Sequence, residues 1–100
     1  MNIFIMVGQR KEFEKGFIVL KQIVKDVDAG KIPTVTQLAN EISKDLQHQV
    51  HTETINNYAD DLVKTQDIQK LSSGNRFVFV PTDQGRGKVQ KQEAGTNINL

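Results

Sequence analysis

The sequence predicts a mainly α-helical domain with a small β-hairpin. Apolar residues recur at helical spacing over residues 10–29, and again over two shorter segments between residues 34 and 65 that a polar turn separates. Strand-like residues follow at 77–80, after a cluster of turn residues. Together with a second strand-like segment around Leu71, before the turn, this gives three helices followed by two strands. That is the order of a winged helix-turn-helix, in which a hairpin called the wing follows a three-helix core.

Length and composition indicate one folded unit. The chain has 100 residues, of which 37% are hydrophobic, enough for a single small core. It contains no cysteine, which excludes a disulfide framework and a thiolate metal site. It has no long apolar run and no signal-peptide pattern, so we expect a soluble, cytoplasmic protein without a membrane partner.

Residues 10–29 are expected to form the first helix. Its apolar stripe has spacings of four, three, four and three residues and consists of Phe13, Phe17, Leu20, Val24 and Val27. Gly30 suits the left-handed conformation that ends a helix, and Pro33 favours an extended connection before it. The apolar residues 1–9 are too few for periodicity to assign and are treated as an N-terminal extension.

Two short helices are expected next. Thr34 and Gln37 fit a capping box, so the second helix starts near Val35 and carries inward Leu38, Ala39, Ile42 and Leu46. After a polar turn at 47–49, Thr52 is expected to cap a third helix that runs to about Thr65. At 100° per residue, its apolar side consists of Ile55, Tyr58, Ala59 and Leu62, and its opposite side of Glu53, Asn57, Asp60 and Lys64.

A hairpin and a tail complete the predicted domain. Leu71 and the segment 77–80 are strand-like, residues 72–75 supply the turn, and Pro81 ends the second strand. From about Asp83 the chain is rich in Gly, Gln, Lys and Asn, a composition typical of disorder. The expected organisation is an N-terminal extension at 1–9, a winged helix-turn-helix domain at 10–81 and a flexible basic polar tail at 82–100.

Three segments carry a resemblance to a known family: KGFIVLKQI at 15–23, PTVTQLANEI at 33–42 and VHTETINNYADDLVKTQDI at 50–68. They resemble the DNA-binding winged helix-turn-helix domains of bacterial transcription regulators, the IclR type most closely. The resemblance covers residues 10–81 and implies a sequence-specific regulator of transcription that binds double-stranded DNA. The Leu-Gly pair with which that family usually ends the third helix is replaced by Thr65-Gln66, and the effector domain that normally follows has no counterpart.

In such a fold, the third helix at about 51–65 lies in the major groove and presents its first turn to base edges. The candidate DNA-binding residues on this helix are Thr52, Glu53, Thr54, Asn56 and Asn57. Asparagine can pair with adenine in two places, and a glutamate can accept from cytosine. The alternative interpretation is that all five are ordinary solvated positions.

Basic residues outside the third helix are candidates for backbone contacts. Lys70 and Arg76 belong to the hairpin, and Lys11 and Lys15 lie on the first helix. In the tail, Arg86 and Lys88 within GRGKVQK resemble a minor-groove arm, although composition alone favours a solubilising tail. Residues 1–25 and residues 70–100 each carry five basic residues against two acidic ones.

The third helix itself argues against DNA. Residues 51–67 hold four acidic residues and one lysine, and this negative charge opposes approach to phosphate. The alternative function is therefore a winged-helix adaptor that binds a protein through its acidic third helix. If the chain does bind DNA, a symmetric homodimer is expected, with Ile3 to Ile5 or the outer side of the first helix as its interface.

Catalysis finds no support in the sequence. The only two histidines, His48 and His51, lie near a predicted turn and show no recognised metal-ligand spacing. No serine has an evident base partner, and GRGK lacks the spacing of a phosphate-binding loop. We therefore expect no enzyme activity, no cofactor, no metal and no small-molecule ligand. The DNA-binding interpretation implies in addition that the protein is associated with the nucleoid.

Overall fold

The structure is a computed structural model that describes the backbone of residues 3–98 and the side chains of residues 16–92. It contains four helices and one antiparallel hairpin within that range. The elements in chain order are α1 (Ile3–Asp28), α2 (Val35–Leu46), α3 (Thr52–Lys64), β1 (Ile68–Ser73), β2 (Arg76–Pro81) and α4 (Asp83–Ile98). No helix in the described part of the chain combines the length and hydropathy needed to cross a membrane.

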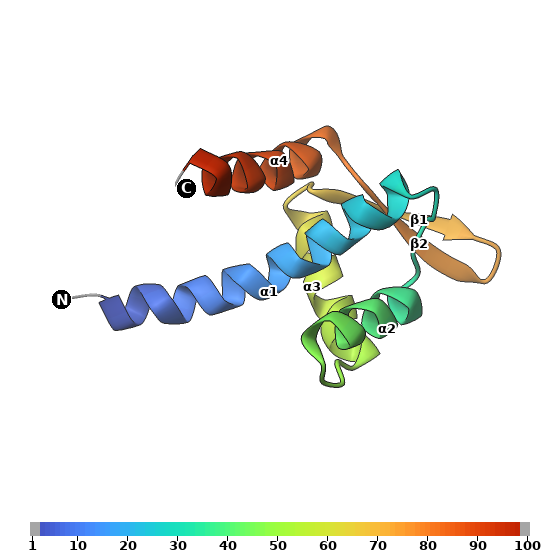
Figure 1. The fold of residues 1–100 in the computed structure, drawn as a ribbon. Helices are drawn as coiled ribbons and strands as arrows, with labels where there is room; N and C mark the ends of the chain where they lie inside the picture. The colour runs from blue at the N-terminus through green and yellow to red at the C-terminus, as the bar shows by residue number, and fades with distance from the viewer. Residues whose placement is uncertain (1–2, 99–100) are drawn as a thin grey trace.

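Helix α1 is the longest element and runs through the middle of the molecule (Figure 1). Helix α2 lies on one side of it, α3 crosses behind it, α4 runs in the opposite direction on the other side, and the hairpin lies at the end where α1 finishes (Figure 1). This is a small, mainly α-helical fold with a winged-helix-like layout, as the sequence predicts.

The core forms where α1, α2, α3 and the hairpin meet. Its largest fully buried side chains are Phe79, Leu20, Ile23, Leu38, Ile55, Ile68, Val19 and Pro33. The connection from α1 to α2 joins the hairpin through the backbone, because Phe79 N–H donates to Pro33 O at 3.1 Å. This hydrogen bond fixes the start of α2 beside β2.

Several local predictions are confirmed. Gly30 has a φ of +85°, and Thr34 and Gln37 form the expected capping box at the start of α2. The hairpin turn is shorter than the predicted 72–75, because Ser72 and Ser73 pair with Phe77 and Arg76 and belong to β1. The loop therefore has two residues, and its first, Gly74, has a φ of +62°. A positive φ at this position suits a type II′ turn, whose twist matches that of the flanking strands.

Two predictions about the helix-turn-helix segment are wrong. Thr52 is the first residue of α3, and the cap residue is His51, which makes no side-chain cap hydrogen bond. Leu46 is 40% exposed, because α2 ends there and Gln47, with a φ of +60°, turns the chain away from the core.

The two terminal segments also differ from expectation. Helix α1 begins at Ile3, since residues 3–9 contain no proline or capping residue that would start the helix later. Residues 83–98 form α4, so the prediction of a disordered tail from about Asp83 is wrong. Composition alone suggested disorder, but contacts with the rest of the fold hold the first part of this helix in place.

Asp67 joins α4 to the segment between α3 and β1. Its carboxylate is almost fully buried, accepts hydrogen bonds from Thr65 Oγ1 at 2.8 Å and Gln84 Nε2 at 2.9 Å, and forms an ion pair with Lys88 Nζ at 3.0 Å. Burial by itself raises the pKa of Asp67, but the hydrogen bonds from Gln84, Thr65 and Lys88 outweigh it and hold that pKa below its usual value. The carboxylate is thus stabilised in its charged form.

Gly85 allows this close approach. A Cβ atom at residue 85 would overlap the backbone carbonyl of Asp67 and would also lie 3.2 Å from Cδ1 of Leu20. Further along the same helix, a Cβ atom at Gly87 would meet nothing within 4 Å. The two glycines of GRGK therefore differ in role, since only the first is needed for packing.

Two carboxyl groups face each other between α1 and α2. Asp26 is buried and accepts a hydrogen bond from Gln22 at 2.9 Å, whereas Oε1 of Glu41 is buried without a hydrogen bond within residues 16–92. Burial of the Glu41 carboxyl, followed by its interaction with Asp26, raises the pKa of Glu41 from 4.5 to about 7. Lys31 opposes this rise and Asp45 adds to it.

Replacing Gly85 by alanine is expected to lower the free energy of unfolding by about 2 kcal/mol, because the new Cβ forces α4 away from Asp67. Thermal unfolding should then occur roughly 10 °C lower. Gly87→Ala is the matched control: it adds the same methyl group to the same helix and should raise stability by about 0.5 kcal/mol. Equal effects of the two substitutions would contradict the packing role of Gly85.

Replacing Glu41 by glutamine is expected to make stability less dependent on pH. The pKa of Glu41 is higher in the folded chain than in the unfolded chain, so the folded state binds this proton more tightly, and wild-type stability falls as pH rises from about 4.5 to about 7. Glutamine resembles the protonated acid, so Glu41→Gln should be more stable than wild type at about pH 8 by about 1–2 kcal/mol, with a smaller difference at about pH 4.5.

Urea unfolding at the two pH values measures this difference. Glu53→Gln, which changes an exposed carboxylate of α3, is the control for removing one negative charge. If Glu41→Gln differs from wild type by the same amount at both pH values, the buried carboxyl pair does not control the pH dependence.

Candidate functional site

Three elements that are distant in sequence meet in a groove of about 370 Å³ beside the hairpin. We call it the hairpin groove. It is lined by Thr34, Val35 and Thr36 at the start of α2, by Asn56 of α3, and by Lys70, Arg76, Phe77 and Phe79 of the hairpin.

The start of α2 contributes free backbone donors to this groove. The N–H of Gln37 is satisfied by Thr34 Oγ1 at 3.2 Å and that of Leu38 by Thr34 O at 3.0 Å. The first four N–H groups of a helix have no partner within the helix, and within residues 16–92 those of Val35 and Thr36 have no other acceptor. They lie at the positive end of the helix dipole, which favours an anion.

The hairpin contributes two cations and an aromatic ring. Lys70 pairs with Phe79 and Ser72 pairs with Phe77, so Lys70, Phe77 and Phe79 share one face of the hairpin. Phe79 is fully buried and anchors this face in the core, whereas Phe77 is 54% exposed. Lys70 Nζ lies 4.5 Å from the centroid of the Phe77 ring, a cation–π contact.

Arg76 is the first residue of β2 and pairs with Ser73, so strand alternation places it on the opposite face of the hairpin from Phe77. It nevertheless lines the groove, because it directly follows the two-residue turn. Its side chain is exposed, and within residues 16–92 it makes no ion pair with an acidic side chain. Lys70 likewise has no acidic partner in that part of the chain. Both cations are therefore free to meet a negatively charged ligand.

The five predicted DNA-binding residues of α3 do not lie on one surface. Asn56 faces the hairpin groove, whereas Thr54 and Asn57 line a different groove on the other flank of α3. Thr52 and Glu53 are exposed at the first turn and line neither of these two grooves. Consecutive residues of a helix point about 100° apart, which is enough to place the two asparagines on different flanks.

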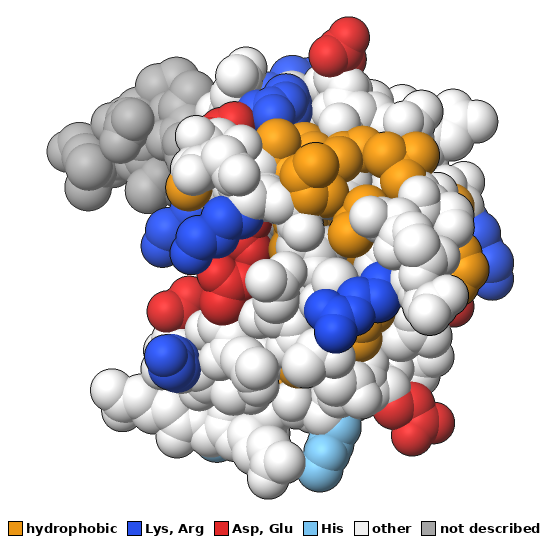
Figure 2. Space-filling model, turned by 90° about the vertical axis from the view of Figure 1, so that its right-hand side faces the viewer, with side chains coloured by type: hydrophobic (Ala, Val, Ile, Leu, Met, Phe, Trp, Pro, Cys, Tyr) orange, Lys and Arg blue, Asp and Glu red, His pale blue; other side chains and the backbone are white. Residues whose placement is uncertain are grey.

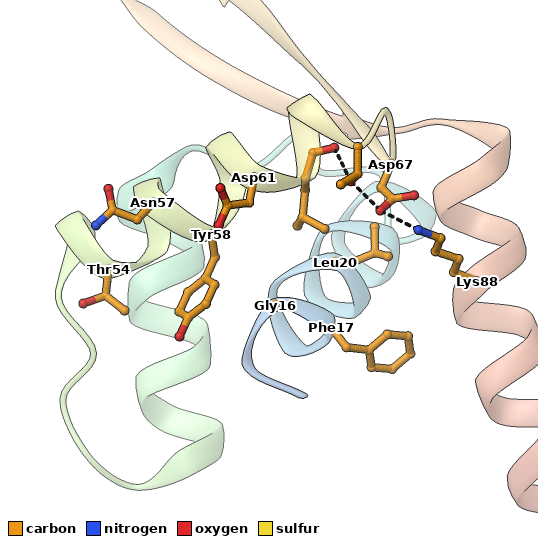
Figure 3. A pocket seen from close by; sticks show the side chains of 11 residues that line it. Gly16, Phe17, Leu20, Thr54, Asn57, Tyr58, Asp61, Asp67 and Lys88 are labelled. Carbon is orange, nitrogen blue, oxygen red and sulfur yellow. Dashed lines mark hydrogen bonds and ion pairs between the residues drawn. The ribbon is translucent and has the colours of Figure 1, made fainter. Parts of the chain in front are cut away.

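The other groove has a volume of about 590 Å³ and lies between α1, α3 and α4 (Figure 3). We call it the helical groove. Its labelled residues include Phe17 of α1, Tyr58 and Asp61 of α3, and the ion pair of Asp67 with Lys88 (Figure 3). Its only cation within the described residues is engaged with Asp67, and it offers no partner for phosphate comparable to the hairpin groove.

The tail residues predicted to contact DNA are paired within the protein. Arg86 Nη1 lies 2.8 Å from Asp28 of α1, and Lys88 Nζ lies 3.0 Å from Asp67. Both cations belong to a helix docked on the body of the molecule, so the prediction of an extended minor-groove arm is wrong. The side chains of Lys11 and Lys15, predicted to approach the DNA backbone, lie outside the described residues.

Charge on the hairpin end of the molecule is mixed. Figure 2 shows this face with separate Lys and Arg side chains, an apolar surface between some of them, and acidic side chains both at the margins and directly beside basic ones. On α3, Glu53 and Asp61 are exposed and Asp60 is partly exposed, and none of the three forms an ion pair within residues 16–92. The hairpin groove combines two such cations with the start of a helix.

The described residues offer no metal centre. Within residues 16–92, no group of three or more His, Cys, Asp or Glu side chains is arranged to hold an ion. His48 and His51 are exposed in the connection between α2 and α3.

Sequence reasoning missed two contributors to the hairpin groove. The start of α2 was predicted as a capping box, but not as part of a binding surface, because the position of the hairpin beside it depends on tertiary contacts. Phe77 was assigned to a strand without a role. The alternation of Phe77 and Phe79 on one face was a usable signal, although it does not tell which of the two rings is buried.

Comparisons with known proteins support the fold alone. No protein-family model matches the sequence, and no curated protein matches it. The chain is similar to the crystal structure of AF1382 from Archaeoglobus fulgidus, with a TM-score of 0.71 and 14% sequence identity over 85% of this chain and 87% of that one. At this identity the likeness shows a shared arrangement of helices and strands.

Proposed function

We propose that the chain is a winged helix-turn-helix protein that binds double-stranded DNA and regulates transcription. The hairpin is the wing and α3 is the recognition helix. The observation that carries the proposal is the hairpin groove, where Lys70, Arg76 and the free N–H groups at the start of α2 surround Asn56. Cations and helix N-termini are the groups that proteins use for phosphate, and asparagine is a common reader of adenine.

Different elements contact the DNA backbone and the bases in this proposal. Phosphates on one strand lie against the start of α2 and the wing, where Lys70 and Arg76 supply positive charge. This brings the first two turns of α3, with Thr52 and Asn56, nearest to the base edges. Asp60 and Asp61 lie about two turns further along α3, roughly 12 Å from Thr52, so their charge acts mainly at a distance.

The resemblance to bacterial regulators supports the same role and adds a symmetric pair of subunits, since one recognition helix reads few base pairs. In this proposal the protein acts in the cytoplasm, associated with the nucleoid. The dimer interface predicted around Ile3 to Ile5 lies outside the residues whose side chains are described.

A second candidate function is a winged-helix adaptor that binds a basic protein surface. The specific observation in its favour is the acidic exposed side of α3, where Glu53, Asp60 and Asp61 have no ion-pair partner within residues 16–92. The two candidates use different surfaces of the same helix. Substitutions in the hairpin groove and on the acidic side of α3 therefore distinguish them.

Arg76→Gln is expected to weaken binding to mixed-sequence duplex DNA roughly three- to tenfold. The slope of the logarithm of the binding constant against the logarithm of the salt concentration should become smaller by about one. The physical reason is the loss of one phosphate contact. Lys70→Gln should act in the same direction. Fluorescence anisotropy of labelled duplex across a salt series measures both quantities.

Arg86→Gln and Lys91→Gln are the matched controls, because each removes the same charge from α4. Arg86 is paired with Asp28, and Lys91 is exposed on a helix that does not line the hairpin groove. Both should leave DNA affinity nearly unchanged. Absence of DNA binding at low salt, together with binding of a basic protein that Asp60→Asn and Asp61→Asn abolish, would replace the first candidate by the second.

A further inference from the structure

Phe77 is an aromatic side chain that the fold does not use for packing. It is 54% exposed, while Phe79, two residues along the same strand and on the same face, is completely buried. Its ring lines the hairpin groove together with Asn56 and Arg76, and its contact with Lys70 Nζ at 4.5 Å places a cation against it. An apolar ring that shares an open groove with two cations suits a ligand that combines a flat surface with negative charge.

A nucleotide has this combination. Its base has a π-face that stacks on an aromatic ring, and its phosphate pairs with lysine or arginine. Asn56 adds an amide that can donate to and accept from the edge of a base. A purely apolar peptide would leave both cations and the amide without partners, so the charge pattern of the groove favours the nucleotide.

We infer that the hairpin groove binds one unpaired nucleobase, stacked on Phe77, next to the duplex. This inference rests on the proposed function and extends it, since it gives the wing a preference for a junction between double-stranded and single-stranded DNA. Bases inside an intact duplex are stacked on both faces and cannot reach a ring that lies within a groove without first being flipped out. A base at a single-stranded end has no such barrier.

The ring and the surrounding groups have separate tasks in this arrangement. Phe77 supplies the stacking surface on the face of its ring that Lys70 does not cover, and Asn56 meets the edge of the base. Lys70 and Arg76 hold the phosphates on either side of the nucleotide, and the free N–H groups of Val35 and Thr36 hold the next phosphate in the duplex direction. Stacking tolerates any base, so the groove selects unpaired structure rather than sequence.

The absence of tryptophan from the chain makes a direct test available. Phe77→Trp introduces a single fluorescent indole at the proposed stacking position, and stacking of a base on it quenches its emission. Leu71→Trp is the matched control, since residue 71 is 43% exposed on the same hairpin but on the opposite face. The probes are a blunt duplex and the same duplex with a short single-stranded thymidine overhang.

The expected result is that the overhang duplex quenches the indole of the Phe77→Trp variant, that the blunt duplex quenches it little, and that neither probe quenches the Leu71→Trp variant. Phe77→Leu, which keeps an apolar side chain but removes the ring, should lower affinity for the overhang duplex about five- to one-hundredfold. Its affinity for the blunt duplex should remain near that of wild type. Circular dichroism and thermal unfolding establish that each variant is folded.

The outcomes separate this inference from the proposed function. If the blunt duplex binds in a manner that depends on Arg76, but the overhang adds no affinity and no quenching at position 77, the stacking inference is wrong and the proposed function stands. Equal quenching of the Phe77→Trp variant by both probes also overturns it, because the ring would then contact intact duplex. If neither probe binds at low salt, the proposed function fails together with the inference.

Discussion

The buried carboxylate of Asp67 is the contact on which the C-terminal half of the structure depends. It lies where α3 has ended and β1 begins, and it joins Thr65 on its own segment to Gln84 and Lys88 on α4. A buried carboxylate is costly unless it is fully hydrogen-bonded, so these partners must remain in place for it to stay charged. Gly85 complements them, since only a residue without a side chain lets α4 come this close to the backbone of Asp67. One acidic side chain and one glycine thus help to fix the position of α4, together with the buried Val89 and the ion pair of Arg86 with Asp28.

This docking changes which surface can bind nucleic acid. In an extended tail, Arg86 and Lys88 would be free cations, but in α4 both are neutralised by acidic partners, Asp28 and Asp67. The hairpin cations, Lys70 and Arg76, have no acidic partner within residues 16–92, and they lie beside the start of α2. No acidic side chain of α3 lines this groove. Two cations and the start of a helix therefore meet at one groove, and in this way a chain with a net charge of only +1 can offer an anion a favourable position.

In the hairpin groove, one phenylalanine packs in the core and a nearby one remains exposed to a ligand. Phe79 anchors the hairpin in the core, and its N–H bond to Pro33 holds the start of α2 at a fixed distance from β2. Phe77, on the same face, extends past the core into the groove. A rigid anchor next to an exposed ring gives the groove a preformed aromatic wall, so a ligand does not have to order the hairpin when it binds.

The sequence by itself determined the local elements: the extent of α2 and α3, the capping box at Thr34, the glycine turn of the hairpin and the strand end at Pro81. These follow from periodicity and from backbone preferences of single residues, which act over a few positions along the chain. The tertiary structure alone decided that residues 83–98 form a helix, that Arg86 and Lys88 are paired, and that Asn56 rather than Asn57 faces the hairpin. Each of these depends on contacts between residues far apart in the chain, as with Arg86 and Asp28, whose separation leaves no local pattern to read. Composition predicted disorder for the last segment because it counts apolar residues, whereas a buried carboxylate and a missing Cβ hold that segment in place.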